Sequence, residues 1–243
     1  METPDVIVQG EDNGDGMVIH YATTKGTDIF GLAIPNMRAD ADWNLGPTWC
    51  YLILGHKTTL IDTGRFGKYE ILQTLLRAAD KELSDIDRII ITHSHEDHDG
   101  NLADVLSAAQ AELWAHSIYR QMISYHPHIK DGAKHPEMPG SCHLCRMPES
   151  FYKDCLPYHK KRSSLNVDFA IDDNHVPSDN DLRFVFTPGH SADSVCIILE
   201  DEVMFTGDTM LPDITPHPSL DMPSRSIVGS YQKVIGTRTW SMA

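Results

Sequence analysis

Apolar residues in this chain recur at spacings that predict alternating strands and helices. Residues 50–64, CYLILGHKTTLIDTG, place β-prone residues on both sides of a Gly-His-Lys turn and predict a hairpin. The apolar positions of residues 68–80 share one helical face: Ile71, Leu72, Leu75, Leu76 and Ala79. Residues 88–91, RIII, then predict a short strand.

The alternation continues on both sides of this region. A second helical face is formed by Leu102, Val105, Leu106 and Ala109. Further strands are expected at 17–24, 111–116, 182–188, 194–200 and 202–208. Strands that alternate with helices in this way predict an α/β fold.

Residues 121–163 depart from this pattern, because they are rich in proline, histidine and cysteine and show little periodicity. We expect a single domain over residues 1–243, in which 121–163 form an insertion or a lid. Within it, Cys142, Cys145, Cys155 and His159 follow the pattern C-x₂-C-x₉-C-x₃-H, which would suit a structural zinc ion. The alternative is that free cysteines and histidines line a lid over a pocket.

Composition and charge exclude several classes of function. The chain has 243 residues, 41% of them hydrophobic, which is enough for one core. Its 20 lysines and arginines face 35 acidic residues, and this net charge of −15 repels phosphate backbones, so we expect no nucleic-acid partner. No long apolar run or secretory leader is evident, so we expect no membrane partner and a cytoplasmic location. A homo-oligomer is left open.

The cysteine content fits this setting. Five cysteines are an odd number in a chain without a secretion signal, which favours reduced thiols or metal ligands over a disulfide framework. Cys50 and Cys196 lie in strand-like runs, so we expect both in the core.

Polar groups crowd the segment directly after the strand at 88–91, ITHSHEDHDGN (91–101). Alternate residues of an extended chain point the same way, so His93 and His95 should converge. Asp97 and His98 follow where the chain must turn, and they can face the same point from another direction. A solvated strand end would explain one histidine, whereas this crowding predicts a metal site suited to Zn²⁺ or Fe.

This segment resembles the H-x-H-x-D-H signature of the metallo-β-lactamase superfamily. LIDTG (60–64), TPGHSADS (187–194) and FTGDT (205–209) resemble other motifs of that family, in the expected order. The resemblance covers about residues 17 to 210. It implies an α/β fold of the metallo-β-lactamase type, an αββα sandwich of two mixed sheets with outer helices.

The resemblance also implies a set of metal ligands and their roles. His93, His95 and His190 would hold one ion, Asp97 and His98 would contribute to a second, and Asp208 would bridge them. Asp62 would orient a ligand imidazole through its other ring nitrogen. The implied cofactor is Zn²⁺, one or two ions, with iron as an alternative, and Asp97 would orient the attacking hydroxide or relay its proton.

The implied activity is hydrolysis of a small-molecule substrate by a zinc-activated hydroxide. We favour an acyl ester or thioester, because a cytoplasmic setting disfavours antibiotics and an acidic surface disfavours RNA. His95 favours a hydrolase over the flavodiiron relatives, which usually carry glutamate there. Two alternatives stay open: a mononuclear iron oxidoreductase similar to persulfide dioxygenases, and a metal-binding interaction domain with impaired catalysis.

The end of the chain departs from the family. A final histidine well beyond the bridging aspartate normally completes the second metal site, and residues 209–243 contain one histidine, His217. We therefore expect either that His217 serves as this ligand or that the C-terminal half is truncated, with no evident sequence for the helices over the second sheet.

Overall fold

Two β-sheets form the framework of this protein. The computed structural model describes residues 3–36, 46–124, 157–172, 182–211, 230 and 240–242. The larger sheet has its strands in the order β1 (Asp5–Val8), β2 (Val18–Ala22), β3 (Asp28–Ile34), β4 (Thr48–Leu54), β5 (Thr58–Ile61), β6 (Arg88–Ile91), β7 (Glu112–His116) and β8 (Phe169–Ile171). The smaller sheet has the order β12 (Trp240–Met242), β11 (Val203–Phe205), β10 (Val195–Leu199) and β9 (Leu182–Phe186).

Both sheets mix parallel and antiparallel pairs. The antiparallel pairing of β4 with β5 confirms the predicted hairpin, with its turn at residues 55–57. From β5 to β8 the pairs are parallel, and the helices α1 (Tyr69–Ala78) and α2 (Leu102–Ala109) make the first two crossovers. Consequently β6 and β7 end at the same edge of the sheet.

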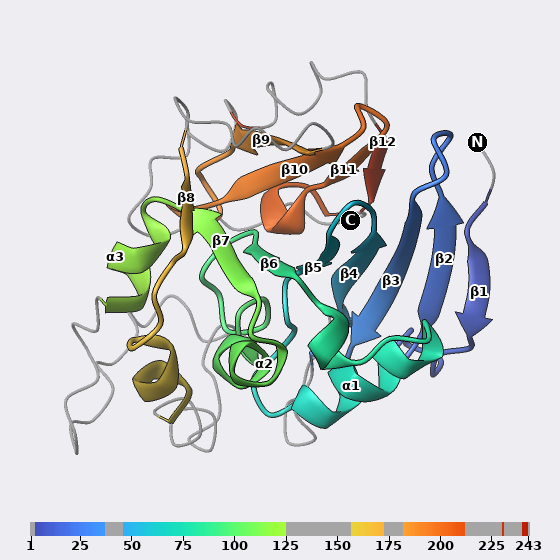
Figure 1. Ribbon diagram of the computed structural model, residues 1–243, viewed down its shortest axis with the longest axis horizontal. Helices are drawn as coiled ribbons and strands as arrows, with labels where there is room; N and C mark the ends of the chain where they lie inside the picture. Colours follow the sequence, from blue (N-terminus) through green and yellow to red (C-terminus); the bar gives the residue numbers. More distant parts are fainter. Residues whose placement is uncertain are drawn as a thin grey trace, which may run out of the picture.

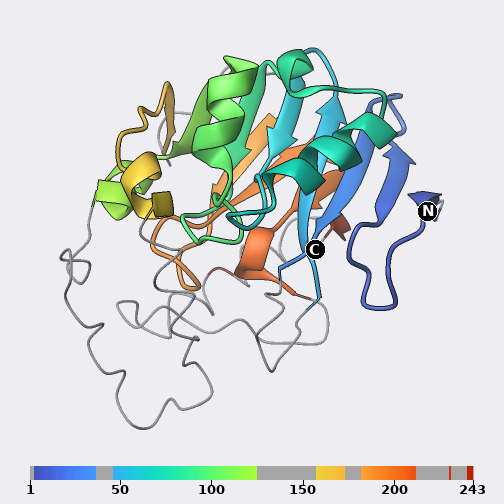
Figure 2. The same cartoon turned by 90° about the horizontal axis from the view of Figure 1, so that it is seen from below.

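The helices and the smaller sheet cover opposite faces of the larger sheet (Figures 1 and 2). The side chains of β6 show how these layers are held, since successive side chains of a strand point to opposite faces of the sheet. Ile89 and Ile91 pack with the buried side of α1 and α2, whereas Ile90 packs with residues of β9 to β11. β6 is therefore apolar on both faces, as expected for a central parallel strand.

The apolar stripe of α1 determines which face it buries. Leu72, Leu75 and Leu76 point into the core beneath the helix, as the spacing predicts. Glu70 in the first turn and Arg77 in the last complement the helix dipole. Tertiary packing of this stripe, rather than the helix ends, provides most of its stability.

Most of the expected elements are confirmed, and three differences matter for the site. The strand expected at 202–208 ends at Phe205, because Gly207–Thr209 form the 3₁₀-helix η3. The central strand β3 was not predicted, since Gly31 interrupts its apolar pattern. A short helix, α3 (Tyr119–Ser124), begins just before the expected insertion.

The expected insertion falls largely outside the described residues and stays a prediction. At its C-terminal end, residues 157–162 are helical. The outer face of the smaller sheet carries a third apolar cluster, Cys196, Ile198 and Met204. Among the residues that the structure describes, no helix has the length and apolar character to cross a membrane.

Candidate metal centre

The ends of several strands deliver histidine and aspartate side chains to one place. His93, His95 and His98 follow β6, His190 lies in the loop between β9 and β10, and Asp208 lies in η3 directly after β11. The backbone amide of Val195 donates to the carbonyl of Thr92, at 3.0 Å, and so ties the smaller sheet to the end of β6. The structure therefore brings the residues singled out in the sequence to one edge of the sandwich.

Three imidazoles form the first group of converging donor atoms. Nδ1 of His95 lies 3.1 Å from Nε2 of His93 and 2.9 Å from Nε2 of His190. Burial, reinforced by the neighbouring imidazoles, lowers the pKa of His93 and brings the pKa of His95 to about 4. Both rings are therefore neutral near pH 7, which is the form that binds a metal.

A second group combines His93 and His98 with the carboxylate of Asp208. The two oxygens of Asp208 face different rings: Oδ1 lies 3.1 Å from Nε2 of His98, and Oδ2 lies 3.3 Å from Nε2 of His190. Burial opposes a charge here, but the attraction of Asp208, Asp97 and Asp62 raises the pKa of His98. In return, His98 lowers the pKa of Asp208 despite burial.

The donor atoms of these two groups are suitable ligands for a metal ion. Nitrogen and carboxylate oxygen are the donor types that Zn²⁺ takes, and all three donor atoms of each group lie within 4.8 Å of one another. A cation near Nε2 of His98 would take the place of the proton that the surrounding carboxylates attract. The residues present therefore fit one or two divalent cations.

Asp62 contacts the ring of His98 on the side away from Asp208. Its Oδ2 accepts hydrogen bonds from Nδ1 of His98 at 2.8 Å and from the hydroxyl of Thr92 at 2.7 Å, and its Oδ1 accepts one from the backbone amide of Thr92 at 2.8 Å. The carboxylate is buried, with 1% of its residue surface exposed. This contact directs the other ring nitrogen of His98 toward Asp208, which is the geometry expected of a residue that orients a ligand.

Asp97 lies beside the two groups. Its Oδ2 is 3.9 Å from Nε2 of His98 and accepts hydrogen bonds from Nδ2 of Asn36, at 2.9 Å, and Oγ1 of Thr48, at 3.2 Å. Nothing in the sequence singled out Asn36, Thr48 or Arg65, which donates to Asn36 at 2.7 Å. Asn36 and Arg65 come from different loops and Thr48 begins β4, and the three follow no periodic pattern, so no local signal indicates them.

Two glycines allow the backbone to approach closely around the site. A Cβ atom on Gly207, whose φ is +47°, would lie 2.8 Å from Oγ1 of Thr92. A Cβ on Gly100 would lie 2.0 Å from the backbone nitrogen of Phe66. Glycine is thus required where the strand ends and the histidine loop come together.

Other residues named from the sequence lie elsewhere. Cys50 and Cys196 are fully buried free thiols, which confirms their place in the core. His217, Cys142, Cys145 and Cys155 lie outside the described residues. His159 lies in the segment 157–162, where its ring is 4.8 Å from that of Tyr158.

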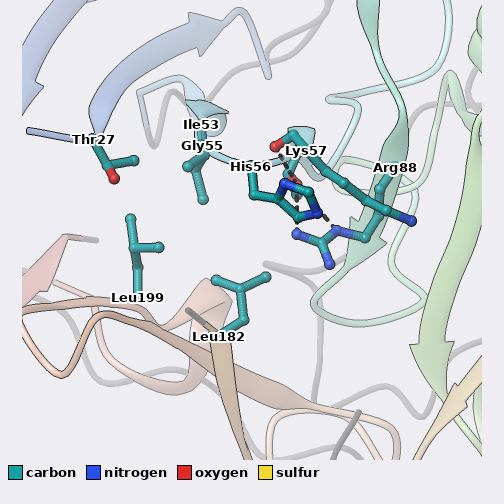
Figure 3. A pocket seen from close by; sticks show the side chains of 9 residues that line it. Thr27, Ile53, Gly55, His56, Lys57, Arg88, Leu182 and Leu199 are labelled. Atoms are coloured by element: carbon teal, nitrogen blue, oxygen red, sulfur yellow. Dashed lines mark hydrogen bonds between the residues drawn. The ribbon is translucent and has the colours of Figure 1, made fainter. Parts of the chain in front are cut away.

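A small hollow lies at the end of the sandwich away from the histidine cluster (Figure 3). It adjoins Arg88, the first residue of β6, whereas the histidines follow the last. Arg88 donates to Oγ1 of Thr59 and lies over the ring of Trp114, and Lys57 binds Glu112 at 2.8 Å. These basic side chains hold strands together, so the histidine cluster is the stronger candidate for a functional site.

Comparison with known proteins agrees with this geometry. The family described as the metallo-beta-lactamase superfamily matches residues 43–237. "Lactamase-like protein nscB" of Aspergillus fumigatus is 28% identical over 198 residues, which are 79% of this chain and 47% of the relative. "Probable metallo-hydrolase YqjP" of Bacillus subtilis is 28% identical over 215 residues, 84% of this chain and 63% of the relative.

A third relative carries a more specific name. "Atrochrysone carboxyl ACP thioesterase" of Aspergillus fumigatus is 28% identical over 158 residues, 65% of this chain and 38% of the relative. This chain therefore spans less than two thirds of the length of each of these curated relatives.

Solved structures show the same fold. A metallo-beta-lactamase family protein of Thermus thermophilus, TTHA1429, has a TM-score of 0.63 at 18% identity and covers 88% of this chain and 72% of its own. AidC, described as a dizinc quorum-quenching lactonase, has a TM-score of 0.62 at 14% identity and covers 98% of this chain and 89% of its own.

Proposed function

Because the chain belongs to the metallo-β-lactamase superfamily, a family of metal-dependent hydrolases, we propose that it hydrolyses a small acyl ester or thioester. The observation that carries this proposal is the convergence of His93, His95 and His190 beside the pair of His98 and Asp208. Two donor groups that share His93 suit one or two ions close together.

We assign these residues as the ligands of Zn²⁺. His93, His95 and His190 would hold the first ion, His98 and Asp97 would contribute to a second, and Asp208 would lie between them. A bound zinc ion would supply Lewis acidity and a water molecule activated as a nucleophile near neutral pH. The donor set, three imidazoles with a carboxylate close to them, supports zinc.

The residues of the chain would then orient the reacting groups and move a proton. Asp62 holds Nδ1 of His98 and so keeps its Nε2 directed at Asp208. Asp97 lies at the rim of the cluster, where its carboxylate would orient the attacking water and accept its proton. No serine or cysteine nucleophile is required for this reaction.

The choice of a thioester or related acyl ester rests on two supports. One relative is named as an acyl-carrier-protein thioesterase, and another as a probable metallo-hydrolase. The net charge of −15 disfavours a polyanionic substrate such as RNA. The cytoplasmic location stays a prediction.

The experiment begins with the metal content of the isolated protein. The metal-free protein is then assayed with acyl thioesters, lactones and bis(p-nitrophenyl) phosphate after addition of Zn²⁺ and, separately, Fe²⁺. We expect zinc-dependent hydrolysis that is fastest with a thioester. His93→Ala and His190→Ala should remove it, whereas His56→Ala, an exposed histidine at the other end of the sandwich, should not.

Other outcomes would overturn the proposal. Iron-dependent oxygen uptake with a persulfide, without hydrolysis, would indicate an oxidoreductase. Metal binding without turnover of any substrate would indicate an interaction domain. In the same series, His217→Ala measures whether this histidine contributes to metal binding.

A further inference from the structure

We propose that Asn36 is a positioning residue that holds the carboxylate of Asp97 in place at the metal centre, and that Arg65 fixes the direction in which Asn36 points. This inference rests on the proposed function insofar as Asp97 is taken as a ligand of the second ion. It assigns a role to two residues outside the histidine motif.

Three parts of the chain meet to build this contact. Asn36 follows β3, Thr48 begins β4, and Arg65 lies in the loop after β5. That loop runs beside the histidine loop, since Thr63 donates from its backbone to the carbonyl of His98 at 2.7 Å. A bridge between Gly64 and Asp99 continues this pairing. Arg65 is therefore held near Asp97 by the backbone itself.

The chemistry of arginine decides how the amide of Asn36 is oriented. A guanidinium has donors and no acceptor, so the atom of Asn36 that faces Nη1 of Arg65, at 2.7 Å, must be the carbonyl oxygen Oδ1. The amide NH₂ group then points the other way and donates to Oδ2 of Asp97 at 2.9 Å. Arg65 is 4% exposed, so water competes little for its bond to Asn36.

The contacts of Asp97 explain why this orientation matters. The terminal torsion of an aspartate is broad and nearly two-fold, so an unsupported carboxylate can present either oxygen. Here Asn36 and Thr48 both donate to Oδ2. The same Oδ2 lies 3.9 Å from Nε2 of His98, so these two donors hold the oxygen of Asp97 that faces the histidine cluster. Supporting residues of this kind typically change metal affinity 10- to 100-fold.

The test is a double-mutant cycle on zinc binding, which does not require any substrate. Metal-free wild type, Asn36→Leu, Asp97→Ala and the double variant are titrated with Zn²⁺, and the binding event that Asp97→Ala weakens is followed. We expect Asn36→Leu to weaken that event at least tenfold in the wild type and to have no further effect when Asp97 is already alanine.

Controls separate positioning from general destabilisation. Asn13→Leu removes an exposed asparagine that donates to Asp15 at the same distance of 2.9 Å, and it should leave zinc binding unchanged. The melting temperature of each metal-free variant reports loss of folding. Asn36→Ser removes the amide donor but keeps a polar side chain, and it replaces the leucine variant if that one unfolds.

Several results would overturn the inference. One is a change of less than threefold in zinc affinity on Asn36→Leu. Another is that Asn36→Leu lowers zinc affinity equally whether residue 97 is aspartate or alanine. A third is that Asp97→Ala weakens no binding event. A coupled effect on zinc binding in a protein that hydrolyses no ester would leave the positioning role intact and reject the proposed function alone.

Discussion

Asp99 and Arg162 form an ion pair that is closed off from solvent next to the histidine loop. Nη1 of Arg162 lies 2.9 Å from Oδ2 of Asp99, and their side chains are 8% and 0% exposed. The same Nη1 donates to the carbonyl of Ser94 at 2.7 Å, and Tyr119 donates its hydroxyl to Asp99 at 2.8 Å. The segment 157–162 is thereby anchored to the turn that carries His95 and His98.

Breaking this pair from one side should be far more costly than removing both charges. Arg162→Met leaves a buried carboxylate without its cation, and we expect a loss of about 3–5 kcal/mol in the free energy of unfolding. Adding Asp99→Asn should recover part of that loss, because no uncompensated charge then remains. Urea denaturation of the single and double variants measures the coupling.

An exposed pair serves as the control for this prediction. Arg183 and Asp201 lie 2.7 Å apart, with side chains 47% and 77% exposed. Arg183→Met should therefore cost less than about 1 kcal/mol. Equal losses at both arginines would show that the pair of Asp99 and Arg162 is not desolvated as the structure indicates.

Removing the carboxylate under His98 should weaken metal binding while the fold is retained. Asp62→Asn replaces the charged acceptor of Nδ1 of His98 with a neutral amide of the same shape, so the hydrogen bond that orients the imidazole is weakened. We expect zinc affinity to fall roughly 10- to 100-fold, measured by competition with a chelator. Asp28→Asn makes the same change in an aspartate–histidine contact of 2.7 Å with His20, away from the site, and should not change that affinity.

The buried carboxyl of Asp193 should make stability depend on pH. Burial, opposed by hydrogen bonds, raises its pKa from 3.8 to about 6. The folded state therefore binds the proton more tightly than the unfolded state, and this contribution is fully present below about pH 4 and is lost as pH rises through about 6. Metal-free Asp193→Asn should be more stable than wild type above pH 6, by up to about 3 kcal/mol.

The comparison is made by urea denaturation at pH 4 and pH 8. The advantage of the Asp193→Asn variant should shrink toward pH 4, because the wild-type carboxyl is then protonated. Asp12→Asn changes an exposed aspartate and should show no such dependence. An advantage that is equal at both pH values would contradict the proposed origin in protonation.

Alanine at Gly207 should be more destabilising than alanine at another glycine of positive φ. Gly207 combines φ +47° with a Cβ position 2.8 Å from Oγ1 of Thr92, whereas Gly67 has φ +77° and no atom within 4 Å of its Cβ position. We expect Gly67→Ala to lower the free energy of unfolding by about 1–2 kcal/mol, from the cost of its backbone conformation alone. Gly207→Ala should lower the free energy of unfolding by about 2–4 kcal/mol, because the contact of its Cβ with Thr92 adds to the backbone cost. Similar losses would argue against the close contact with Thr92.

A strong apolar period was enough to predict several elements from the residues alone. The hairpin of β4 and β5, the helices α1 and α2 and the strand β6 were predicted because one or both faces of each are buried, and burial imposes the period of the element on its residues. β3 was missed, since Gly31 and Asp28 break its pattern although its pairing with β2 and β4 places it inside the sheet. Pairing between strands is a non-local property that a local period does not contain.

The same division holds for the candidate site. His93, His95, Asp97 and His98 are close in sequence, so one motif was enough to propose them together, and resemblance to a family added His190 and Asp208. Asp62 was expected to orient a ligand imidazole, and in the structure that ring is His98. That Asn36 and Thr48 hold Asp97, and that Arg162 binds Asp99, became evident only from the packing of the chain. These partners come from strand ends and loops far apart in the chain. Their positions depend on how the sheets pack, and a contact between distant side chains leaves no repeating pattern in the sequence.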